Sequence, residues 1–103
     1  MDKYILNKDN ITIKCNDLRK WGQWFENNKN LRCVALHQLN NLKVSTVFLG
    51  IDHNWSEKGP PLLFETMIFG GVYNQTCQRY STYIEALKGH KIAAKKVGFK
   101  IKG

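Results

Sequence analysis

Two strand-like segments in the middle of the chain carry apolar side chains on both faces. Residues 43–50 read KVSTVFLG, and residues 62–69 read LLFETMIF. Successive side chains of a β-strand point to opposite faces, so most positions on both faces of these segments are apolar. A sheet covered by helices on one side would leave its second face apolar and exposed, and such a face favours self-association. We therefore expect a homo-oligomer.

Residues 32–39 (RCVALHQL) precede the first of these segments, with Asn40-Asn41 between them. Asparagine tolerates the positive φ of a type I′ turn, so the pair predicts an antiparallel hairpin. Cys33 falls inside this strand, where we expect a small core residue. At the N-terminus, "KYIL" and "ITIK" flank the turn-type cluster "NKDN" and predict a second, smaller hairpin.

Two segments have the signals of amphipathic helices. Asn16 or Asp17 can cap a helix that runs to about residue 28. Near the C-terminus, Thr82 and Glu85 have the spacing of a capping box, and Gly98 would end the helix. Its expected buried face consists of Tyr83, Leu87, His90, Ala94 and Val97.

These elements predict an α+β fold: a single antiparallel sheet of about five strands with two amphipathic helices packed on one face. The length of 103 residues fits one domain. We assign residues 1–97 to a single α+β domain and residues 98–103 to a short basic C-terminal tail.

Composition excludes several classes of protein. No apolar run is long enough for a transmembrane helix, and the N-terminus lacks the apolar core of a signal peptide. We expect a cytoplasmic protein, in a host cell's cytoplasm, with no membrane partner. Three widely spaced cysteines indicate neither a disulfide nor a zinc site. No P-loop, dinucleotide-binding glycine pattern or serine elbow is present, and we expect no cofactor and no metal.

The net charge of +8 is concentrated at the C-terminal end. Six lysines and no acidic residue follow residue 87, which leaves about +2 for the rest of the chain. Such a lysine-rich end attracts polyanions, so nucleic acid is one possible partner. The same lysines are equally typical of a solvated helix end that complements the helix dipole.

The stretch "GIDHNWSEKGPPLLFET" (residues 50–66) holds most of the candidate site residues. Asp52 and His53 end a strand, where functional side chains are commonly displayed, although Asp52 is also placed to cap the turn. Trp55 follows on the loop, and Pro60-Pro61 would stiffen its exit. Near Arg79 and Tyr80, an exposed tryptophan suits stacking on a nucleobase.

Glu65 and His90 are polar side chains at apolar positions. A carboxylate within an apolar strand is either paired, for instance with Arg79 or Arg32, or kept as a ligand acceptor or general base. His90 lies on the apolar face of the last helix, where it is either a satisfied core residue or a ligand. We treat His37 as structural.

The strings "VSTVFLGIDHNW", "GPPLLFETMIFGG" and "RYSTYIEALKGH" resemble a widespread family of small, uncharacterised tailed-phage and prophage proteins. The similarity covers about residues 43–90 and extends weakly to the N-terminal segment with its tryptophan-containing helix. Tyr83 stands where members usually have tryptophan, and the lysine-rich end is peculiar to this chain. The resemblance implies a phage accessory protein, and such proteins often act against host defences.

Three hypotheses about function follow. The first is a counter-defence protein that binds an anionic, nucleotide-type small molecule as a homo-oligomer without turnover. Its predicted ligand-binding residues are Asp52, His53, Trp55, Glu65, Arg79, Tyr80 and His90. The second is a phosphodiester hydrolase in which Asp52, His53, Glu65 and His90 converge. The third is a nucleic-acid- or protein-binding inhibitor that uses the basic C-terminus. Catalytic residues cannot be assigned from the sequence.

Overall fold

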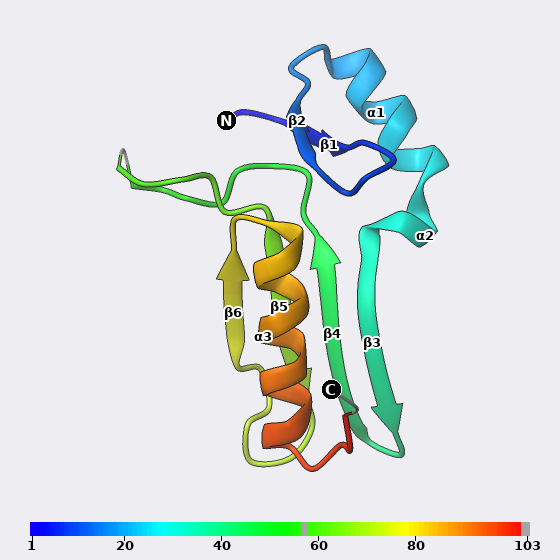
Figure 1. Ribbon diagram of the computed structural model, residues 1–103, viewed down its shortest axis with the longest axis vertical. Helices are drawn as coiled ribbons and strands as arrows, with labels where there is room; N and C mark the ends of the chain where they lie inside the picture. Colours follow the sequence, from blue (N-terminus) through cyan, green and yellow to red (C-terminus); the bar gives the residue numbers. More distant parts are fainter. Residues whose placement is uncertain (57, 102–103) are drawn as a thin grey trace.

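The computed structural model describes residues 1–56 and 58–101, and it confirms the α+β class (Figure 1). The strands form two antiparallel sheets rather than one. A two-stranded sheet joins β1 (Tyr4–Leu6) to β2 (Thr12–Lys14). A four-stranded sheet has the order β3 (Cys33–Leu39), β4 (Leu42–Phe48), β5 (Phe64–Phe69) and β6 (Cys77–Tyr80).

The helices begin at the predicted caps. The Asp17 carboxylate accepts two backbone N–H groups at the start of α1 (Leu18–Asn27). The Thr82 hydroxyl accepts the Glu85 N–H at 3.2 Å, so the predicted N-cap of α3 (Tyr83–Lys96) is confirmed. The Glu85 carboxylate accepts from the Thr82 hydroxyl at 2.9 Å. A short helix, α2 (Lys29–Arg32), was not predicted.

Helix α3 covers one face of the four-stranded sheet (Figure 1). Side chains that alternate along β4 and β5 point toward it, and Val44, Phe48 and Phe64 are almost completely buried there. Small residues on α3 allow the helix to approach closely: Ala86, Gly89 and Ala94 are buried. Of the five residues predicted for the buried face, His90 and Ala94 are buried, whereas Tyr83, Leu87 and Val97 are half-buried.

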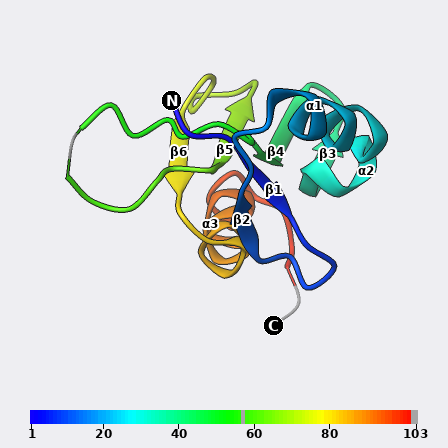
Figure 2. The same ribbon diagram turned by 90° about the horizontal axis from the view of Figure 1, so that it is seen from above.

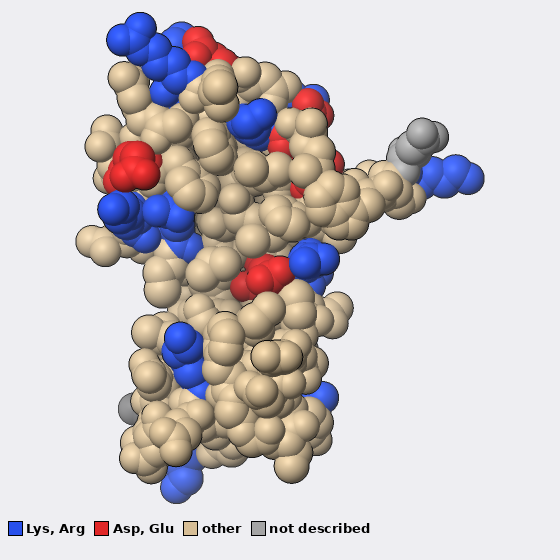
Figure 3. All heavy atoms as spheres, turned by 180° about the vertical axis from the view of Figure 1, so that it is seen from behind, with Lys and Arg blue, Asp and Glu red and all other residues tan. Residues whose placement is uncertain are grey.

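The opposite face of this sheet, which we call the open face, is the side seen in Figure 3, and no helix of the described residues packs across it (Figure 1). Strand register assigns to it Leu36, Gln38, Lys43, Ser45, Val47, Glu65, Met67, Phe69, Cys77 and Arg79. Leu36 is 52% exposed and Phe69 36% exposed. The space-filling view shows few charged side chains over the lower, sheet-bearing half of the molecule.

Helix α1 does not lie on the α3 face, in contrast to the predicted arrangement of both helices on one face. It packs against β1 and, with the small hairpin, closes one end of the main sheet (Figures 1 and 2). The Trp21 indole N–H donates to both the Tyr4 and the Gly50 carbonyl, at 3.1 Å each, and these bonds fix the position of α1. Trp24 adds an edge-to-face contact with Phe48.

Cys33 is exposed, so the expectation of a core cysteine is wrong. The register of β3 against β4 shifts between Cys33 and Ala35, which is a β-bulge. Cys33 is therefore paired with Val47, an open-face residue, and turns away from the core.

Candidate functional site

A chain of hydrogen-bonded polar side chains crosses the main sheet beneath α3. His37 Nδ1 on β3 lies 2.8 Å from His90 Nε2 on α3, and His90 Nδ1 lies 2.7 Å from the Thr46 hydroxyl on β4. The Thr46 hydroxyl also contacts the Thr66 hydroxyl on β5. The three inner members, Thr46, Thr66 and His90, are at most 2% exposed. We call these four residues, with Tyr80 as described next, the polar relay.

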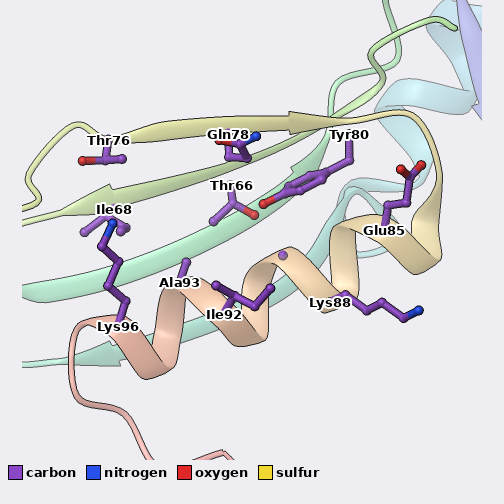
Figure 4. Close-up of a pocket in the computed structure, with 11 residues that line it drawn as sticks. Thr66, Ile68, Thr76, Gln78, Tyr80, Glu85, Lys88, Ile92, Ala93 and Lys96 are labelled. Carbon is purple, nitrogen blue, oxygen red and sulfur yellow. The ribbon is translucent and has the colours of Figure 1, made fainter.

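Tyr80 on β6 completes the relay. Its hydroxyl is directed toward Thr66 (Figure 4) and lies against Gly89, where a Cβ atom would overlap it. The relay thus takes one side chain from each strand of the main sheet and one from α3. It begins at half-exposed His37 on one side of α3 and ends at Tyr80 on the other.

The environment of the relay favours the neutral forms of two of its members, His90 and Tyr80. Burial lowers the pKa of His90, and the neighbouring His37 lowers it further. Burial raises the pKa of the Tyr80 phenol, so this hydroxyl stays protonated. Neutral imidazole has one N–H donor and one acceptor nitrogen, which suits a ring with a partner at each nitrogen.

A groove of about 450 Å³ opens between β6 and α3, at the Tyr80 end of the relay (Figure 4). Its polar floor consists of Thr66, Gln78 and Tyr80, and its apolar wall of Ile68, Ile92 and Ala93. Thr76, Glu85, Lys88, Gly89 and Lys96 complete the lining. Figure 4 shows the Tyr80 ring reaching across the groove toward Thr66 and α3, with both lysines extending from the helix.

Two of the predicted site residues, Tyr80 and His90, therefore belong to the relay, and Tyr80 also lines the groove. Glu65 and Arg79 lie on the open face, on the other side of the sheet. Arg79 Nε donates to Glu65 Oε2 at 3.0 Å, so Glu65 is paired with one of the two arginines considered for it. The other, Arg32, stacks on the Phe25 ring at 3.8 Å.

Asp52, His53 and Trp55 form a third location, on the long segment that projects between β4 and β5 (Figure 2). The Asp52 carboxylate accepts the N–H groups of Asn54 and Leu62, at 2.7 and 3.0 Å, and so closes the base of the loop as an Asx cap. The His53 ring meets the Trp55 ring edge-on at 5.9 Å between centroids. Trp55 itself is 70% exposed.

The predicted convergence of Asp52, His53, Glu65 and His90 is thus not found, because these residues lie on a loop, on the open face and beneath α3. Within residues 1–56 and 58–101, no group of three or more His, Cys, Asp or Glu side chains is arranged to hold a metal ion. No helix in the same part of the chain is long and apolar enough to cross a membrane.

The roles of Thr46, Thr66 and His37 were not predicted from the sequence. A signal was present: Thr46 alternates with Val44 and Phe48, and Thr66 stands between buried positions of the next strand. Polar residues at two buried positions of adjacent strands need each other or a helix side chain as partner. His90 on a buried helix face supplies that partner.

Comparison of the chain with protein-family models, curated proteins and solved structures found no match.

Proposed function

We propose that this protein binds a small anionic molecule with a planar ring, of the nucleotide type, in the groove between β6 and α3. The observation that carries the proposal is a polar floor within an otherwise apolar groove that has two lysines on its lining. Small-molecule sites are commonly of this kind, with a few convergent polar groups in an apolar cavity of about 300–1,000 Å³.

Each part of the groove suits one part of such a ligand. The Gln78 amide and the Tyr80 and Thr66 hydroxyls offer donors and acceptors for a base or ribose edge. The apolar wall suits the face of a ring. Lys88, in the first half of α3, and Lys96, at its C-terminal end, supply positive charge for phosphate groups. Glu85, in the first turn near Lys88, favours a donor such as a ribose hydroxyl.

The proposal keeps the ligand class expected from the sequence but assigns it to a different place. A protein that only holds its ligand would sequester it, which accords with the phage accessory role that the resemblance implies. The hydrolase hypothesis loses its basis, because its four residues do not meet. The basic-terminus hypothesis involves Lys88 and Lys96 as well. An experiment must therefore distinguish the effect of these two lysines in the groove from the effect of the overall positive charge of the C-terminal end.

Titration calorimetry with linear nucleoside monophosphates, 3′,5′-cyclic mononucleotides and cyclic dinucleotides tests the proposal. We expect at least one of these to bind, and the double variant K88E/K96E to bind it about tenfold or more weakly, a loss of about 1.4 kcal/mol. The matched control is K91E/K95E, which makes the same charge change on the same helix at exposed positions outside the groove.

Two outcomes decide against the groove. If no nucleotide binds to the wild-type chain, the proposal is wrong. If both double variants weaken binding equally, the interaction depends on overall charge, and the basic-terminus hypothesis is favoured instead. Circular dichroism of all variants establishes that they are folded.

A further inference from the structure

The open face is arranged in three rows of side chains across the strands. Register places Leu36, Ser45, Met67 and Cys77 in a middle row. Toward the end of the sheet near α1 lies a row of Val47, Glu65 and Arg79, and toward the other end a row of Gln38, Lys43 and Phe69. Consecutive rows are about 7 Å apart, which is two residues along a strand.

Charge is distributed unequally between the outer rows. The row near α1 carries Glu65, whose side chain is 17% exposed, together with its ion-pair partner Arg79, so this row has no net charge. The distal row carries Lys43, whose ammonium lies over the Phe69 ring, 4.6 Å from its centroid. The middle row is uncharged, and Leu36 and Met67 give it an apolar centre.

We propose that a second copy of this chain covers the open face, related to the first by a two-fold axis that runs along the middle row. This operation lays the distal row of one copy on the α1-side row of the other, strand over strand. Phe69 then faces the partner's Glu65, and the ammonium above Phe69 meets that carboxylate. Arg79 occupies Oε2 of Glu65, so Oε1 is the atom that accepts the lysine.

Symmetry repeats this ion pair, so each interface has two Lys43–Glu65 contacts around an apolar centre. Two sheets that pack face to face with nearly aligned strands are a common arrangement, and an isologous contact of this kind is the commonest form of protein dimer. The proposal is independent of ligand binding, because the groove lies on the α3 side of the sheet.

Sedimentation velocity over a series from low to high micromolar concentration tests the dimer. We expect a dimer for the wild-type chain and a monomer for Met67→Lys, which brings like charges together at the two-fold axis. The matched control is Ile84→Lys, the same kind of change at an α3 residue that is 65% exposed, which should remain dimeric. If Met67→Lys fails to fold by circular dichroism, Leu36→Lys replaces it. A wild-type monomer throughout the series, or equal dissociation of test and control variants, would overturn the proposal.

Charge reversal at Lys43 and Glu65 tests whether the two-fold axis runs along the middle row. Lys43→Glu and Glu65→Lys should each weaken the dimer about tenfold or more, because each places like charges in contact. A mixture of the two variants should dimerise again, because in the mixed dimer each residue at position 43 faces a residue of opposite charge at position 65. A mixture as monomeric as its components would show that the rows do not meet in this way.

Discussion

His90 is a base inside the core, and both of its ring nitrogens have partners. A buried imidazole is stable there while it is neutral, because a charge in this position would lose its hydration without gaining an acidic partner among the groups that face it. The neighbouring His37 also disfavours protonation of His90 and so lowers its pKa further. The relay is therefore sensitive to acid.

Stability should fall as the pH decreases from neutral. Because the pKa of His90 is lower in the folded state than its ordinary value of 6.5, the unfolded chain takes up a proton first. The stabilisation is fully present above pH 6.5 and is lost progressively as the pH falls toward the folded-state pKa. Urea denaturation at pH 7.5 and at pH 5.5 measures the difference.

Replacing single histidines shows which of them causes this pH dependence. His90→Gln should be less stable at neutral pH, because buried polar partners lose their bonds at a cost of about 1–3 kcal/mol, and its stability should change less with pH. His53→Gln, on the projecting loop, should retain the wild-type dependence. An unchanged pH dependence in His90→Gln would contradict the explanation.

At the scale of elements, two glycines within helices differ in the space that a larger side chain would have. Gly22 in α1 has no described heavy atom within 4 Å of the place where a Cβ would stand. Gly89 in α3 faces the Tyr80 hydroxyl directly, and a Cβ there would overlap it. Gly89 therefore allows Tyr80 to lie between the helix and β5, where it forms part of the groove floor.

Gly22→Ala should stabilise the protein and Gly89→Ala should destabilise it. Alanine in an open helix position gains about 0.5–1 kcal/mol over glycine. At position 89 that gain is outweighed by displacement of Tyr80, and overpacking of this kind costs about 1–3 kcal/mol. Thermal denaturation measures both. A Gly89→Ala/Tyr80→Ala double variant should lose less stability than the two single variants lose together. Strict additivity would rule out the contact.

The elements that could be predicted are those with local signals. The capping side chains act within four residues of chain. The Asn40-Asn41 hairpin was predicted correctly, but its turn is not type I′, because of the two asparagines only Asn40 has a positive φ, at 54°. Strand β6 was not predicted, because most of its side chains are exposed and show no alternation. It is a strand because it pairs with β5, which is a long-range contact that no local pattern encodes.

Only part of the candidate site could be predicted. Tyr80 and His90 were among the expected ligand-binding residues, whereas Thr46, Thr66 and His37 were not. Pairing with an arginine was one of the two alternatives considered for Glu65. The separation of Tyr80 and His90 from Glu65 onto opposite faces depends on the register of β5 with β6, since a shift of one residue would reverse every side chain. The relay likewise requires Thr46 and Thr66 to be directly opposite each other, which only the assembled sheet determines.

The whole molecule is held together at the end of the main sheet. There α1 and the small hairpin meet β4 through a few specific contacts. Trp21 donates to the Gly50 carbonyl, and Trp24 packs on Phe48, a member of the buried core. Gly50 has φ 76° and leaves no room for a Cβ, which would lie 2.7 Å from the Phe25 ring. These contacts join the N-terminal part to the same core that α3 covers.

Such shared packing predicts that the chain unfolds as one unit. In a Trp55→Phe variant, the remaining tryptophans, Trp21 and Trp24, both lie on α1, so fluorescence reports on the N-terminal part. Far-UV circular dichroism reports on the strands and helices of the whole chain. Because Trp24 contacts the core through Phe48, the two urea transitions should coincide in midpoint and slope. A fluorescence transition at lower urea would mean that α1 and the small hairpin detach first, and that the main sheet with α3 is stable without them.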